Sequence, residues 1–144
     1  MKIRRALSLF FALTISITLC ISSSFATENS ILRGSPTLSE YGAKVSKGYS
    51  SGEIIITCDV EANDISERVG VSSIKIYKSS GSYVTTITGT EENGLIGTGT
   101  PLHSPSYTYK GVSGTYYYAK ITVFATINGV TDSRTITTNT VQAP

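Results

Sequence analysis

The segment 59–68 carries the densest group of acidic and amide side chains in the chain, and such side chains can bind a metal ion. Its candidate metal-binding oxygens are those of Asp59, Glu61, Asn63 and Asp64. Calcium binds such oxygens, but an EF-hand loop needs glycine at its sixth position and glutamate at its twelfth, where this segment has Asp64 and Gly70. Two readings stay open, a calcium site between the loops of a β-sandwich and a solvated loop that closes a strand. No other cofactor is expected.

His103 is the single histidine and lies in a polar stretch between two prolines. Nucleophilic catalysis would need a serine beside it and an orienting acid, but we expect no nucleophile elbow here, and an imidazole in such a loop is usually exposed to solvent. A carboxylate pair for glycoside hydrolysis could be drawn from Glu53, Asp59, Glu91 and Glu92, but no spacing in the sequence fixes such a pair. A small extracellular hydrolase is therefore the weakest of the functions considered.

The glycine-rich stretch 94–99 could be taken for a phosphate-binding loop. It precedes Pro101 and not a helix, and it lacks the lysine of a P-loop. We expect a flexible loop.

The nine tyrosines, in a chain without tryptophan, suggest a binding surface. Alternation along 116–127 places Tyr116, Tyr118 and Phe124 opposite the predicted core, and Tyr107 and Tyr109 share a face of the preceding run. Tyrosine offers a large contact area and a hydroxyl group, which suits glycans and proteins. The alternative is that these rings pack between two sheets.

Short runs rich in Ile, Val, Thr and Tyr indicate the elements that position these residues. They are 44–49, 53–62, 72–78, 82–89, 105–110, 116–127 and 133–141. Turn residues separate them, and no helical period is sustained after the N-terminal segment. The pattern predicts an all-β fold, a single antiparallel immunoglobulin-like β-sandwich of about seven strands.

The pair Asn128-Gly129 predicts a two-residue hairpin turn after the run 116–127. That register places Ile121 opposite Ile136, which suits a buried face, but it also places Val123 opposite Arg134. We therefore expect a bulge or a longer loop near 130–133.

The N-terminus has the pattern of a cleaved signal peptide, with Lys2, Arg4 and Arg5 before an apolar run and cleavage predicted after Ala26. The predicted parts are a signal peptide over 1–26, a flexible leader over 27–38 and the β-sandwich over 39–144. We then expect the protein to be secreted or extracellular, with attachment to the cell surface as the alternative and no membrane contact after cleavage. Acylation at Cys20 and an uncleaved anchor are the alternatives.

Loss of residues 1–26 leaves nine basic against ten acidic residues, without a run of either sign. This balance argues against a nucleic-acid partner. Cys58 remains without a disulfide partner, and its apolar surroundings in the sequence predict a small buried side chain.

The stretch Gly114-Thr115-Tyr116-Tyr117-Tyr118 resembles the start of the penultimate strand of immunoglobulin-like and fibronectin type III-like sandwiches. With Arg33-Gly34 and the Val-Gly-Val segment at 69–71, it also resembles small secreted Gram-positive bacterial proteins of unknown function. The first resemblance implies that Tyr117 is the tyrosine-corner residue. The second implies an extracellular β-sandwich and carries no activity.

Three functions follow from these patterns. The preferred one is a secreted, non-catalytic module that binds an extracellular protein or glycan. The second is a structural or assembly protein that pairs through edge strands, with 135–141 as the candidate edge. The third is the hydrolase.

Overall fold

The computed structural model describes residues 35–144, and this part of the chain consists of β-strands joined by turns, without a helix. The strands are β1 (Leu38–Lys47), β2 (Glu53–Ser66), β3 (Arg68–Lys78), β4 (Tyr83–Thr88), β5 (Ile96–Gly97), β6 (Thr100–His103), β7 (Ser106–Lys110), β8 (Tyr116–Ile127), β9 (Val130–Thr137) and β10 (Val141–Gln142). Every strand pairing is antiparallel. The prediction of an all-β, antiparallel protein is confirmed. The predicted signal peptide and its cleavage site at Ala26 lie outside the described residues.

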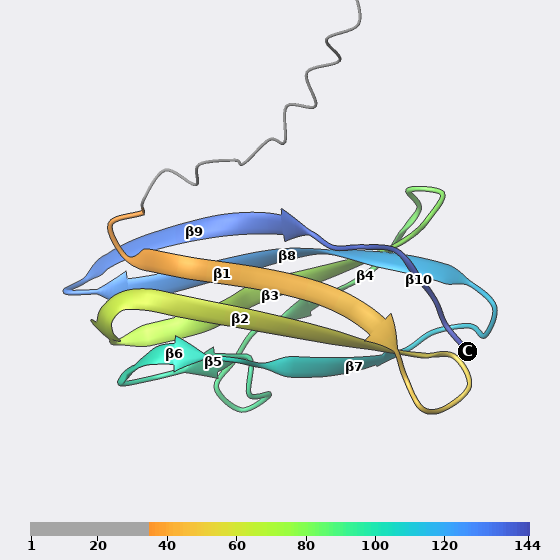
Figure 1. The fold of residues 1–144 in the computed structure, drawn as a ribbon, viewed down its shortest axis with the longest axis horizontal. Helices are drawn as coiled ribbons and strands as arrows, with labels where there is room; N and C mark the ends of the chain where they lie inside the picture. Colours follow the sequence, from red (N-terminus) through yellow and green to blue (C-terminus); the bar gives the residue numbers. More distant parts are fainter. Residues whose placement is uncertain (1–34) are drawn as a thin grey trace, which may run out of the picture. The chain divides into compact units, whose positions relative to one another are not determined.

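The strands form two sheets packed face to face (Figure 1). In the 4-stranded sheet, called sheet A here, β2 pairs with β1 on one edge and with β6 and β7 on the other. In the 6-stranded sheet B, β8 and β3 are central; β9 and β10 pair with β8, and β4 and β5 pair with β3. Because β2 packs against β8 and β3, the arrangement is sandwich-like.

The core lies between the sheets and is built from alternate residues of the long strands. Its largest fully buried side chains are Leu38, Ile54, Ile56, Val60, Val69, Val71, Ile74, Ile76, Leu95, Tyr117, Ile121 and Val123. Burying one such side chain contributes roughly 1.5–3 kcal/mol. Alternation directs the intervening residues to the two outer faces, where their side chains can contact a ligand.

The hairpin between β8 and β9 has the register of a simple two-residue turn, in place of the bulge or longer loop that we expected. Asn128 and Gly129 have φ angles of 51° and 74°, as a two-residue type I′ turn requires. Val123 lies opposite Arg134 with no shift of register, so the expected bulge is wrong. Polar groups are tolerated there because β9 is an edge strand. The Arg134 guanidinium donates to the Asp132 carboxylate at 2.8 Å.

The sandwich begins before the predicted boundary at residue 39. Thr37 is buried, and its hydroxyl donates to the Ala125 carbonyl at 3.0 Å. The Asn63 side-chain amide donates to the Ser35 carbonyl at 2.8 Å and to the Pro36 carbonyl at 3.0 Å. These long-range hydrogen bonds join the end of the predicted leader to sheets B and A.

The stretch 94–99 differs from the flexible loop that its glycines predicted. Leu95 and Ile96 are buried, and the Val71 N–H donates to the Leu95 carbonyl at 2.8 Å. Ile96 and Gly97 form β5 against the start of β3. The loop is therefore attached to sheet B by apolar side chains that the glycines flank.

Candidate functional site on the outer face of sheet B

The outer face of sheet B carries side chains that alternate with the core residues of β8 and β3. On β8 these include Tyr116, Tyr118, Lys120, Thr122 and Thr126, and on β3 they include Arg68, Lys75 and Tyr77. The neighbouring edge strands add Thr131, Ser133, Thr135 and Thr137 from β9 and Thr86 and Thr88 from β4. This face is thus composed of rings, hydroxyls and cations.

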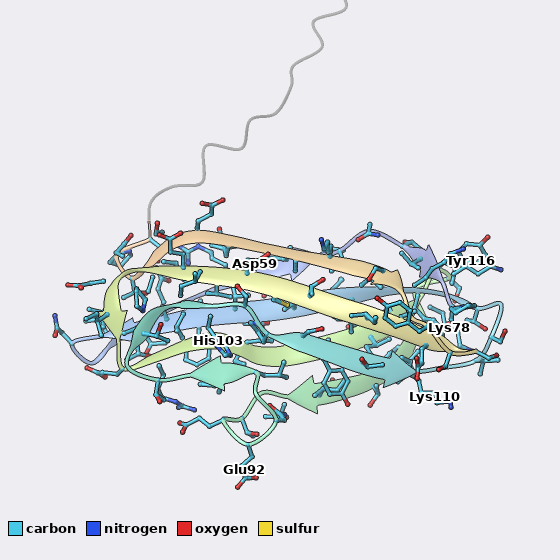
Figure 2. The ribbon with its side chains drawn as sticks, turned by 60° about the horizontal axis from the view of Figure 1, so that its bottom comes forward. Asp59, Lys78, Glu92, His103, Lys110 and Tyr116 are labelled. Carbon is cyan, nitrogen blue, oxygen red and sulfur yellow. The ribbon has the colours of Figure 1, made fainter. Side chains whose placement is uncertain are left out.

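Four tyrosines, Tyr77, Tyr83, Tyr116 and Tyr118, gather at one end of this face and are called the tyrosine cluster. The rings of Tyr77 and Tyr118 are stacked, with centroids 5.4 Å apart. Tyr83 meets Tyr77 edge to face at 5.8 Å. Tyr83 and Tyr116 are 59% and 50% exposed, so they offer the open ring surface of the cluster. Tyr116 lies at the same end of the sandwich as Lys78 (Figure 2).

Phe124 shares the outer side of β8 with Tyr116 and Tyr118, but it is only 8% exposed. The Arg68 guanidinium lies 5.8 Å from the centroid of its ring, within cation–π range, and is 3.8 Å from the Glu91 carboxylate. Arg68 and Phe124 line a hollow of about 380 Å³. Its other lining residues are Ser72, Thr88, Gly89, Ile96, Thr122, Thr131 and Ser133. Phe124 is therefore the floor of a hollow and not an exposed anchor.

Tyr107 and Tyr109 do not join this surface. They lie on β7 of sheet A, opposite Ile56 and Ile54, and both pack against the core. Burial, with a smaller contribution from Tyr117, raises the pKa of the Tyr109 hydroxyl. The expectation of one platform that includes these two rings is wrong. The signal was available, because they are the only large apolar side chains of that strand and must cover the core.

The acidic stretch 59–68 spans the end of β2, the turn and the start of β3. Asp59 and Glu61 lie on the outer face of sheet A and, with Glu40, surround a shallow hollow at Gly42. The Asn63 amide is used to hold the chain at 35–36, and an Asp64 carboxylate oxygen accepts the N–H of Ile65 at 2.7 Å. Within residues 35–144, no group of three or more His, Cys, Asp and Glu is arranged to hold a metal ion.

His103 lies on β6 and is half-buried against the loop that carries β5. Its Nε2 donates to the Gly94 carbonyl at 2.8 Å, which fixes the proton on that nitrogen. A Cβ atom at Gly97 would come within 2.9 Å of its Nδ1, so the ring fits only against a glycine. Figure 2 shows His103 in the left half of the view and Tyr116 at the right end. Its role in the fold is to hold the loop against sheet A.

One motif was missed in the sequence. Residues 48–52 read Gly-Tyr-Ser-Ser-Gly, which matches the Gly-x-Ser-x-Gly pattern that we did not expect to find. The structure places it in the turn between β1 and β2, whereas a nucleophile elbow joins a strand to a helix. The Ser50 N–H donates to the Glu53 carboxylate at 3.1 Å. The pattern therefore belongs to a hairpin turn.

Comparison with models of protein families and with curated proteins finds no match for this chain. In the part of the chain described by the structure, no helix has the length and apolar character needed to cross a membrane.

Proposed function

We propose that this protein is a secreted, non-catalytic binding module with an immunoglobulin-like sandwich fold, and that it holds an extracellular glycan on the outer face of sheet B. The observation that carries the proposal is the convergence of Tyr77, Tyr83, Tyr116 and Tyr118 on one open surface, although they come from three strands. Core packing does not require large rings on an outer face. Aromatic side chains in such positions are typical anchors for ligands.

The order of the strands supports the immunoglobulin-like assignment. The strand order is β1-β2-β7 in sheet A and β9-β8-β3-β4 in sheet B. These orders correspond to strands A-B-E and G-F-C-C′ of immunoglobulin-like sandwiches. Tyr117, near the start of β8, accepts a hydrogen bond from the Val112 N–H at 3.0 Å, as a tyrosine corner does.

Secretion is proposed from the charged start, apolar run and small residues that end at Ala26. N-terminal sequencing of protein recovered from the medium of expressing cells tests it. The expected first residue is Thr27. Protein that stays with the cells and still begins at Met1 would contradict the assignment.

A binding experiment tests the glycan site. The purified protein is applied to an array of polysaccharides, together with the Tyr83→Ala/Tyr116→Ala double variant. Loss of two exposed ring contacts is expected to weaken binding about tenfold or more. Tyr49→Ala is the matched control, because Tyr49 is 97% exposed but lies in the turn between β1 and β2. Equal binding by all three proteins would place the glycan elsewhere, and no binding by any of them would remove the proposal.

Edge-to-edge assembly is the second candidate, and β4 is the observation that favours it. This strand, Tyr83–Thr88, lies at the edge of sheet B and carries no charge, proline or glycine. The edge expected from the sequence, 135–141, is partly covered by β1. The Asn139 side-chain oxygen accepts the Val45 N–H, and the Asn139 side-chain nitrogen donates to the Val45 carbonyl. Concentration-dependent growth in size-exclusion chromatography, abolished by Thr85→Lys, would support assembly. A monomer at all concentrations would exclude it.

A further inference from the structure

Lys75 and Lys120 lie directly opposite each other on β3 and β8, in the centre of the outer face of sheet B. Both are exposed. Like charges in directly opposed positions on neighbouring strands destabilise a sheet. Within residues 35–144 the ion pairs are Arg68–Glu91 and Arg134–Asp132, so neither lysine has a carboxylate partner in the described part of the chain. Two lysines without a carboxylate partner in that part of the chain therefore occupy neighbouring positions on this face.

The strand residues that surround these lysines on the same face are neutral. On either side of the pair, Thr137 of β9 lies opposite Lys120 and Thr86 of β4 lies opposite Lys75. Three acidic strand residues, Glu40, Asp59 and Glu61, share one hollow on the outer face of sheet A, whereas Asp132 of β9 in sheet B is paired with Arg134. The two outer faces of the sandwich thus differ in charge, and the tyrosine cluster is on the positive one.

The tyrosines adjoin the lysine pair in the next row of the sheet. The Lys120 ammonium lies 5.5 Å from the centroid of the Tyr77 ring, which holds this cation in place by a cation–π contact. Tyr77 is in turn stacked on Tyr118. An anion placed between the lysines would therefore have an aromatic wall on one side and hydroxyl groups on the other.

We propose that the ligand of this face is an anionic polysaccharide, with a carboxylate or sulfate group between Lys75 and Lys120 and neighbouring sugar rings on Tyr83 and Tyr116. Charge complementarity selects the acidic sugar, because the fold leaves both cations unpaired. Length favours a polymer, since the 12 residues of β8 extend the face over roughly 40 Å. This inference rests on the proposed glycan-binding function and adds the charge of the ligand.

Two charge-matched double variants test it. Lys75→Gln/Lys120→Gln neutralises the pair, and Lys44→Gln/Lys47→Gln removes the same charge from exposed positions of β1 on sheet A. Binding of polygalacturonate, dextran sulfate and neutral dextran is measured for both and for the unchanged protein. The first variant is expected to bind both anionic polymers about tenfold or more weakly, and the second to bind them normally. Added salt should weaken binding by the unchanged protein far more than by the first variant.

The outcomes separate this inference from the proposed function. If dextran or another neutral glycan binds, depends on Tyr83 and Tyr116 and is indifferent to both lysine variants, the glycan site stands and the anionic ligand is wrong. An equal loss in both lysine variants means attraction by net charge alone and overturns the inference. Stronger binding to duplex DNA or to phosphatidylserine vesicles than to the anionic polysaccharides also overturns it. Circular dichroism of each variant confirms that the fold is retained.

Discussion

The ring of Tyr117 lies so close to Gly111 that a Cβ atom on the glycine would come within 2.7 Å of the Tyr117 Cζ and Oη atoms. The ring is 1% exposed, and its hydroxyl accepts the Val112 N–H at 3.0 Å. A buried tyrosine and the turn before β8 are thus fitted to each other. The turn also fixes where β8 begins, and therefore where Tyr116 and Tyr118 reach the outer face.

Gly111→Ala is expected to destabilise the protein by about 1–3 kcal/mol, because the added methyl group has to displace the Tyr117 ring or the turn. The measurement is the urea midpoint of unfolding. Gly42→Ala is the control, since a Cβ atom there meets nothing within 4 Å. It should leave the midpoint unchanged or raise it. Equal midpoints for the two variants would show that the close contact has no energetic effect.

Tyr117→Phe is expected to cost about 1 kcal/mol, because it keeps the ring but leaves the Val112 N–H without its partner. Tyr109→Phe is the matched comparison, as Tyr109 packs edge to face on Tyr117 with centroids 5.7 Å apart and its hydroxyl lies on a half-buried ring. Urea unfolding should place the Tyr117 variant clearly below the Tyr109 variant. The reverse order would show that the hydrogen bond of the Tyr117 hydroxyl does not stabilise the fold.

Cys58 links stability to alkaline pH. Burial, together with the neighbouring Asp59 charge, raises the pKa of its thiol from 9.0 to about 12. Above pH 9.0 the unfolded chain loses this proton and the folded chain keeps it, so stability falls as the pH rises through that interval. Cys58→Ala should therefore show a flatter loss of urea midpoint between about pH 8 and about pH 10.5. Tyr109 also has a raised pKa, but it is present in both proteins and its effect cancels.

The same burial predicts that a thiol reagent labels Cys58 slowly in the folded protein and rapidly in urea. Rapid labelling without urea, or identical pH profiles for the two proteins, would contradict the burial of this side chain.

Much of this architecture could be predicted because alternation is a local property. The run 116–127 alternates between apolar and polar side chains, and its inward residues, such as Ile121 and Val123, are buried as expected. Asn128-Gly129 likewise determines its own turn. In each case the residues that carry the signal are also the residues that form the element.

The remaining features depend on contacts between distant segments. β5 is short and lies where Leu95 packs in the core and Ile96 is buried beside the hollow on sheet B, which the surrounding glycines do not indicate. The tyrosine cluster requires β3 to lie beside β8, so that Tyr77 meets Tyr118. Alternation could place each tyrosine on an outer side of its own strand, but the pairing that joins them is not encoded locally.

Acid conditions are expected to loosen the chain where Ser35 meets Asp132. The Ser35 hydroxyl donates to the Asp132 carboxylate, and this bond, with the nearby Arg134 charge, lowers the pKa of that carboxyl below 3.8. A lowered pKa stabilises the fold above pH 3.8, and the contribution is lost as the pH falls through the folded value. Asp132→Asn should be less stable than the unchanged protein at neutral pH and should converge with it in acid. Parallel curves over the whole range would contradict this link.

His103 is expected to stabilise the position of the loop that carries β5. His103→Ala removes the bond to the Gly94 carbonyl and the ring that fills the space over Gly97, at a cost of about 1 kcal/mol. The Val71 N–H donates to the Leu95 carbonyl in the same loop. Hydrogen exchange of the Val71 amide should therefore accelerate in His103→Ala, while amides in the β8–β9 hairpin keep their rates. Leu102→Ala is the control, since Leu102 adjoins His103 on β6 but is 55% exposed. Unchanged exchange at Val71 in His103→Ala would mean that the buried Leu95 and Ile96 hold the loop without the imidazole.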